Sequence, residues 1–391
     1  EVAFSVTGPS ALVSYLEAQV IWIRFRIQVA TLAKKSPNQL AQMLGTATCE
    51  RERDIILESL DAAGVVPNFD IKIDTKGYFE HIKNRAETLL EIMGDPARAF
   101  EAGMRAASCA EQHLIAVEAC KSAGFISTSN VEAARVLNIN AGGTTGHEHT
   151  QRYGSDFNAF SAVRDRVAGE VTFLLDTYST RFSGLPSAIR VMRQTPERQC
   201  SIRFDSESTM EGDYLLGVHT QREVGMEAGI KLGGGFNADR ARRFETLREQ
   251  AGWPAEKQSY MFGQYLVEPH VPLPTRGEVG AVYKLSQSGD VPTMKFSDNP
   301  AKSSAPGNPV TWRLLSPGRA DRGSRPIGII GQLGEKPPAD YAVLTNGRVM
   351  HTPPEMLENA TPEISPQTEA LVLELKQSRL EQIAQAAKAT I

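Results

Sequence analysis

Residues 171–205, VTFLLDTYSTRFSGLPSAIRVMRQTPERQCSIRFD, contain two short apolar runs separated by a helical segment. The first run, VTFLLD, ends at Asp176, and the second, SIRFD, ends at Asp205. Each run has the length of a β-strand, and strands that alternate with helical segments are typical of a parallel sheet. The stretch therefore predicts a strand–helix–strand unit in which each strand ends at a carboxylate.

The same alternation continues further along the chain. AGIKL (228–232) runs into Gly233, Gly234 and Gly235, and SYMFG (259–263) ends at Gly263. In a parallel α/β barrel the carboxyl ends of the strands carry the groups that act on the substrate. Four such runs predict an α/β barrel, although strands in general also tend to end in polar or small residues.

The regions on either side of these runs have other patterns. Before residue 124 the sequence predicts helices over residues 11–35, 39–64 and 84–123. After residue 278, short apolar runs with tight turns at residues 287–290 and 346–347 predict antiparallel strands. The tail from residue 368 predicts an amphipathic helix on the surface of its own domain.

Composition excludes several classes of protein. The chain has 391 residues, with 42 basic and 46 acidic side chains, so charge gives no reason to expect a nucleic acid or a membrane surface as partner. Charged residues interrupt every apolar stretch, so we expect no membrane span. No signal peptide is visible, although the chain begins at Glu1. Four scattered cysteines without a CxxC pair favour a reducing, cytoplasmic location and no structural zinc.

The stretch AGGTTGHEHTQRYGSD (141–156) leaves three interpretations open. His147 and His149 could chelate a metal if they lay on a strand, but a hydrolytic site would need further ligands. His219 and His270 do not follow clear strands. Alternatively, the glycines allow backbone N–H groups to approach a phosphate, with a histidine beside it. The third interpretation is a plain polar loop.

Two further candidates lie at the predicted strand ends. The three glycines at 233–235 form either an anion-binding loop or a flexible turn between strand and helix. Arg203 and Asp205 are two residues apart on one strand, so their side chains point the same way. With Asp176 they would suit an anionic substrate and a metal–diphosphate, or form a structural ion pair.

Five blocks together resemble the nicotinate phosphoribosyltransferase family. They are GFISTSNVEAARVLNINAGGTTGHEHTQRYGSD (124–156), AFSAVRDR (159–166), TFLLDTYSTRFSGLPSAI (172–189), SIRFDSES (201–208) and VYKLSQSGDVPTMKFSDNPAKSSAPGNPVTWRL (282–314). The resemblance spans roughly residues 10–350. It implies an α/β protein with an irregular type II phosphoribosyltransferase α/β barrel over residues 99–278. A discontinuous α/β sandwich domain would combine residues 1–98 with residues 279–391, including the terminal helix.

The resemblance also implies a reaction. Nicotinate and phosphoribosyl diphosphate would give nicotinate mononucleotide and diphosphate, with ATP hydrolysis and Mg²⁺, in NAD biosynthesis or salvage. A homodimer would carry its active sites at the subunit interface. Two alternatives stay open: a non-catalytic or weakened nucleotide-binding homologue, and an enzyme that uses nicotinamide. A metal-dependent hydrolase that uses His147 and His149 is a third, from another class.

By the resemblance, His147 is the histidine that ATP phosphorylates, and His149 has no role beyond local hydrogen bonding. Arg203 binds the nicotinate carboxylate, Thr144 contacts nicotinate, and Asp205 is catalytic. The remaining residues assigned by the resemblance are Arg105, Asp176 and Ser206 for substrate, Gly234, Gly235 and Gly263 for phosphate, and Asp205 with Glu207 for Mg²⁺. Some positions depart from the family pattern, chiefly at phosphoribosyl contacts: Glu207 and the runs 236–238 and 264–266. These departures motivate the weakened-homologue alternative.

Overall fold

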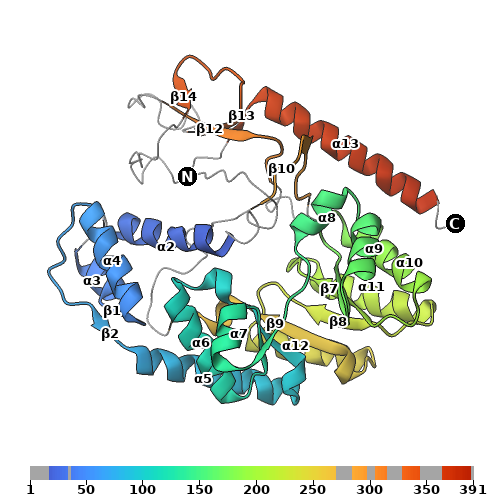
Figure 1. Cartoon of the computed structure of the whole chain (residues 1–391), viewed down its shortest axis with the longest axis horizontal. Helices are drawn as coiled ribbons and strands as arrows, with labels where there is room; N and C mark the ends of the chain where they lie inside the picture. Colours follow the sequence, from blue (N-terminus) through green and yellow to red (C-terminus); the bar gives the residue numbers. More distant parts are fainter. Residues whose placement is uncertain are drawn as a thin grey trace.

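A curled sheet of seven parallel strands forms the centre of the chain (Figure 1). The computed structural model describes residues 17–33, 37–269, 284–296, 304–314, 328–343 and 363–388. In spatial order the strands are β5 (Asn140–Ala141), β4 (Ser127–Thr128), β3 (Ala99–Glu101), β9 (Gln258–Phe262), β8 (Gly229–Leu232), β7 (Cys200–Phe204) and β6 (Val171–Leu174). Within the described residues the edge strands β5 and β6 do not pair with each other, so the sheet is an open half-barrel.

Buried apolar side chains hold this sheet to its helices. Phe173, Ile202 and Leu232 have no exposed surface, and each contributes about 1.5–3 kcal/mol by burial. The predicted strands at 171–176, 201–205, 228–232 and 259–263 are confirmed as β6 to β9. The associated helices are α5 (Thr75–Met93), α6 (Ala110–Ala123), α7 (Val131–Leu137), α8 (His147–Tyr153), α9 (Asp156–Arg166), α10 (Leu185–Gln194), α11 (Met210–Glu223) and α12 (Ala238–Gln250).

Two long helices predicted near the N-terminus are each interrupted. The helix predicted over 39–64 is α3 (Pro37–Leu44) and α4 (Glu50–Ala62), with β1 (Thr46–Ala47) between them and β2 (Lys72–Ile73) beside it. The helix predicted over 84–123 is broken by η1 (Pro96–Arg98), β3 and η2 (Met104–Ala106). The break begins at Gly94, whose φ of 71° ends α5 in a left-handed cap. The first predicted helix corresponds to α2 (Glu17–Leu32) over its described part.

The C-terminal segments form a second, four-stranded sheet. Its order is β14 (Tyr341–Val343), β12 (Pro309–Leu314), β13 (Gly328–Gln332) and β15 (Glu363–Ile364). Antiparallel pairing is confirmed for β12 with β13 and with β14, whereas β15 runs parallel to β13. The predicted hairpin is present, but residues 287–288 belong to its strand β10 (Gln287–Ser288), paired with β11 (Val291–Pro292). The turn predicted at 346–347 lies outside the described residues.

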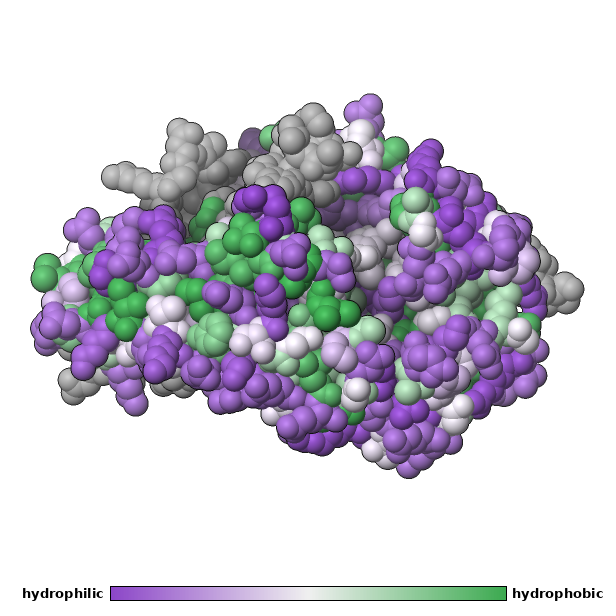
Figure 2. All heavy atoms as spheres, turned by 60° about the horizontal axis from the view of Figure 1, so that its bottom comes forward, coloured by the Kyte–Doolittle hydropathy of each residue, from purple (hydrophilic) through white to green (hydrophobic). Residues whose placement is uncertain are grey.

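The terminal helix α13 (Pro366–Lys388) confirms the predicted surface helix. It lies beside β13 (Figure 1) and also contacts η3 (Thr180–Gly184), the turn that follows β6. Hydrophilic residues cover much of the face shown in Figure 2, and hydrophobic patches gather near its middle. No helix among the described residues is long and apolar enough to cross a membrane. The domain limits 1–98, 99–278 and 279–391 stay a prediction.

Candidate functional site

The glycine-rich loop connects β5 to α8 and bridges the two edges of the open sheet. A side chain at Gly142 would lie 2.9 Å from Cε2 of Phe100, so only glycine fits there without a shift. The hydroxyl of Thr145 donates to the carbonyl of Thr172 on β6, at 3.3 Å. The loop therefore delivers His147, the first residue of α8, to the edge strand β6.

His149 turns away from this edge, so the metal chelate of His147 and His149 is wrong. Both residues lie on a helix, where side chains two positions apart point in different directions. Nε2 of His149 donates to the carbonyl of Ala159 at 3.0 Å, and its ring packs on Tyr153. The local role predicted for His149 is confirmed, and His270 lies outside the described residues.

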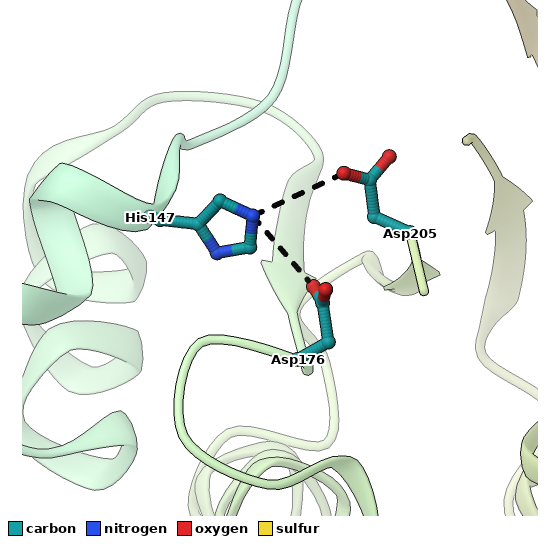
Figure 3. A group of neighbouring side chains, drawn as sticks. All are labelled: His147, Asp176 and Asp205. Atoms are coloured by element: carbon teal, nitrogen blue, oxygen red, sulfur yellow. Dashed lines mark ion pairs between the residues drawn. The ribbon is translucent and has the colours of Figure 1, made fainter. Parts of the chain in front are cut away.

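His147 points at two carboxylates (Figure 3). Its Nε2 lies 4.0 Å from Oδ1 of Asp176 and 3.9 Å from Oδ2 of Asp205. The two aspartates follow β6 and β7, which are adjacent parallel strands in register, so their side chains emerge at one edge. Since one ligand atom from each residue lies within 4.8 Å of the others, the three could also hold a metal ion.

Lys295, which the sequence analysis did not single out, completes this cluster. Its ammonium donates to Nε2 of His147 at 2.7 Å and lies 3.5 Å from Oδ2 of Asp176. Its side chain is 3% exposed. A buried ammonium needs partners of this kind, because an isolated buried charge is strongly unfavourable. Lys295 therefore fills a position suited to a cation.

These contacts fix the protonation state of His147. Because an ammonium can only donate, Nε2 accepts, and the imidazole proton lies on Nδ1, 3.1 Å from the hydroxyl of Thr177. Burial and the Lys295 charge outweigh Asp176 and Asp205 and lower the pKa of His147 to about 4. The imidazole is therefore neutral at pH 7, with its nucleophilic lone pair on Nε2.

Arg203 contacts Asp205 through the carboxylate oxygen that does not face His147. Its guanidinium donates to Oδ1 of Asp205 at 2.8 Å and to the hydroxyl of Thr144 at 2.6 Å. Burial would raise the pKa of Asp205, but the charges of Arg203 and Lys295 lower it well below its usual range, so this carboxylate stays ionised. His147 and Arg203 thus lie on either side of Asp205, since each faces one of its carboxylate oxygens.

Gly234 and Gly235, which follow β8, leave the space that the backbone of Asp205 and the side chain of Glu207 occupy. Gly234 and Gly235 have φ values of 82° and 67°, which L side chains rarely adopt. A Cβ at Gly234 would lie 2.5 Å from the carbonyl oxygen of Asp205, and one at Gly235 would lie 2.5 Å from Oε1 of Glu207. The loop thus packs closely behind residues 205–207. The exposed Glu207 lies beside Gly235 and outside the cluster of His147 and the two aspartates.

Further cations face the same side of the sheet. Arg105 on η2 bonds Glu17 of α2 at 2.9 Å and interacts electrostatically with Asp205. Burial, Lys295 and Arg105 lower the pKa of Lys284 to about 8. With Arg203, these side chains give the edge an excess of donors suited to anionic ligands.

The other predicted residues lie at the same carboxyl edge. Ser206 donates to Oδ2 of Asp176 at 2.8 Å, which leaves Oδ1 of Asp176 without a hydrogen-bond partner among the described residues. Gly263 follows β9 directly and lies beside the backbone of Ala102. Glu101, at the end of β3, is fully buried and bonds His113 at 3.1 Å. That pair anchors the loop that leads to Arg105.

The curated proteins that are similar in sequence to this chain share one name. The chain is 30% identical over 244 residues to the nicotinate phosphoribosyltransferase of Bacillus subtilis (strain 168), which covers 60% of this chain and 47% of that protein. It is 26% identical over 312 residues to the Bos taurus protein of the same name, covering 67% and 56%. The chain therefore spans about half the length of the curated relatives it matches.

Other comparisons add less. No protein-family model matches the chain. The solved nicotinate phosphoribosyltransferase from Vibrio cholerae superposes with a TM-score of 0.47 at 17% identity, over 64% of this chain and 61% of that chain. This overlap is too low to assign the fold by itself.

Proposed function

We propose that this chain belongs to the nicotinate phosphoribosyltransferases and catalyses their reaction. Nicotinate and phosphoribosyl diphosphate would form nicotinate mononucleotide and diphosphate, coupled to ATP hydrolysis, in NAD biosynthesis or salvage. One observation supports this most directly: a neutral, partly buried His147 has its Nε2 lone pair directed at Lys295 and lies within 4.0 Å of two aspartates, at the carboxyl edge of a parallel sheet. Phosphate chemistry in α/β barrels takes place at that edge.

Arg203 is the group best placed to bind the carboxylate of nicotinate. A guanidinium offers a planar fork that matches a carboxylate. Its Nε is buried and has no hydrogen-bond partner among the described residues, and Gly233 leaves space beside it. The same preference for a carboxylate disfavours nicotinamide as the base. Thr144, bonded to Arg203, would contact the ring.

His147 would receive the γ-phosphoryl group of ATP. Nε2 forms a bond to the γ-phosphorus while the bond from that phosphorus to the bridging oxygen breaks, and ADP leaves with the electron pair. Because Nε2 carries no proton, no base is needed for the attack. Lys295 lies 2.7 Å from Nε2 and would donate to the phosphoryl oxygens. Phosphohistidine hydrolysis would later release phosphate.

The residues present fit Mg²⁺. Asp176 and Asp205 each direct one oxygen toward His147, and Oδ1 of Asp176 is buried without a hydrogen bond among the described residues. Carboxylate oxygens are the ligands that Mg²⁺ prefers. Asp176 and Asp205 would hold the ion, whereas Glu207, which the resemblance also assigns to Mg²⁺, lies outside this cluster. Bound Mg²⁺ would neutralise charge on the leaving diphosphate.

Asp205 would also stabilise the ribose. Departure of diphosphate builds positive charge at C1 of the ribose, which an ionised carboxylate favours. The glycines at 234, 235 and 263 and the side chain of Arg105 would contact phosphate groups. We further propose the type II phosphoribosyltransferase arrangement, a homodimer and a cytoplasmic location, on the resemblance of the sequence blocks.

The test is a mononucleotide assay with nicotinate, phosphoribosyl diphosphate, ATP and Mg²⁺. We expect product from the native chain and loss of ATP stimulation in His147→Ala. His219→Ala is the matched control, because that histidine is exposed on α11. Mononucleotide binding without turnover would replace the proposal by the weakened homologue. Equal turnover of nicotinamide would refute the role given to Arg203.

A further inference from the structure

The ring of Tyr178 connects the site to the C-terminal helix. Tyr178 directly follows Asp176 and Thr177 and is 7% exposed. The guanidinium of Arg379, from α13, lies 3.9 Å from the centre of this ring. At that distance a cation over an aromatic face stabilises the pair by about 0.5–2 kcal/mol. A helix far along the chain thus touches the segment that carries a site carboxylate.

Tyr178 also contacts the elements that hold His147. Its hydroxyl points at the carbonyl of Thr150 on α8, 3.5 Å away, and α8 begins at His147. Its ring lies 5.5 Å from that of Phe296, the residue after Lys295. Its chain neighbour Thr177 bonds Nδ1 of His147. Movement of this ring would therefore affect both nitrogens of the imidazole.

Arg379 is an unusual residue for its position on α13. It is 6% exposed, whereas its neighbours Lys376 and Leu380 are exposed. Its guanidinium lies 3.5 Å from Oδ2 of Asp156, the fully buried first residue of α9. A well-packed apolar residue would anchor a helix equally well or better than a buried ion pair. Packing alone therefore does not explain why a charged, planar side chain occupies this buried position on α13.

We propose that Arg379 is a positioning residue for His147 and acts through Tyr178. Asp156 holds the guanidinium, the guanidinium holds the ring, and the ring fixes residues 176–178 against α8. The C-terminal helix thereby supports the site through this one side chain. The proposal rests on the proposed function only for its effect on turnover, because the placement of His147 can be observed without substrate.

Arg379→Lys is the main variant. It keeps a positive charge for Asp156, so the fold is preserved, but it loses the planar group over the ring. Arg379→Gln and Tyr178→Leu remove the contact more completely. Lys376→Gln is the matched control, since it removes an exposed cation from the same helix. Each variant is compared in the full chain by thermal unfolding, by the imidazole NMR resonances of His147 at a fixed pH and by ATP-dependent labelling of His147.

We expect Arg379→Lys to shift the imidazole NMR resonances of His147 at a fixed pH, because Thr177 and Lys295 would no longer hold both ring nitrogens in place. Misplacement by about 1 Å can slow a reaction about 100-fold, so labelling and kcat should fall by about 10- to 100-fold with little change in KM. Lys376→Gln should match the native chain.

If Arg379→Lys and Tyr178→Leu lower the unfolding temperature but leave the imidazole resonances and the labelling of His147 native, Arg379 is merely structural and the proposal fails. A native chain without mononucleotide synthesis would refute the proposed function instead, while the imidazole resonances would still decide the role of Arg379.

Discussion

Replacing Lys295 by Met would test the chemistry of the site most directly. Methionine keeps most of the side-chain length but removes the ammonium that donates to Nε2 of His147 at 2.7 Å. A hydrogen bond from a charged group contributes about 1.5–3 kcal/mol, so phosphorylation of His147 by ATP should slow by about 10- to 150-fold. The ammonium also opposes Asp176 and Asp205 in setting the pKa of His147.

Loss of Lys295 should therefore raise the pKa of His147, because the two carboxylates favour the imidazolium. Protonated imidazole has no free lone pair, so labelling of the variant should decline between pH 8 and pH 6, whereas the native chain, with a pKa of about 4, should not decline for this reason. The assay is transfer of γ-³²P from ATP to acid-labile histidine, measured at both pH values. Lys121→Met, on the exposed face of α6, is the control. Native labelling by Lys295→Met at both pH values would refute this account.

Two predictions concern stability. Gly234→Ala should destabilise the fold by about 1–2 kcal/mol or more, because it combines a left-handed φ with a Cβ 2.5 Å from Asp205, whereas Gly143→Ala, with open space around it, should be nearly neutral in thermal unfolding. Because the folded chain holds His147 below its ordinary pKa of 6.5, the unfolded chain binds more protons between pH 6.5 and about 4. The free energy of unfolding should therefore decrease by up to about 3 kcal/mol as the pH is lowered from 6.5 to about 4. His147→Gln should flatten this slope in denaturant titrations, and an unchanged slope would contradict the neutral imidazole.

Local pattern was sufficient to predict the strands that carry the site. Each of β6 to β9 is a mostly apolar run of four or five residues, and an aspartate or glycine follows within two residues. The strands β4 and β5 have only two residues each, too short for any periodicity to show. β3 has three residues within an alanine-rich region, so it resembled helix. Its end at the buried Glu101 becomes meaningful only when the neighbouring strands are known.

Register explains why Asp176 and Asp205 could be paired from the sequence. Both follow strands of one parallel sheet, and adjacent parallel strands end at the same edge. The separation of Arg203 from Asp205 by two residues then brings the guanidinium to that edge as well. These inferences need only the spacing of the residues along the chain and the alternation of side chains along a β-strand.

Lys295 and Arg379 could not be found in this way, because their roles depend on how distant segments pack. Lys295 is 148 residues from His147 and follows a short hairpin, and Arg379 lies on a helix whose pattern indicates only a surface. A lysine or arginine in such a segment is usually solvated, so its sequence context carries no signal. What identifies them is burial of a charge: Lys295 is 3% exposed and Arg379 is 6% exposed. Because burying a charge is unfavourable unless its partners compensate, the partners of these two cations, Asp176 and Asp156, mark where the C-terminal segments engage the sheet. The neutral state of His147 thus depends on residues from both halves of the chain, and a C-terminal truncation that kept the parallel sheet intact would still lose it.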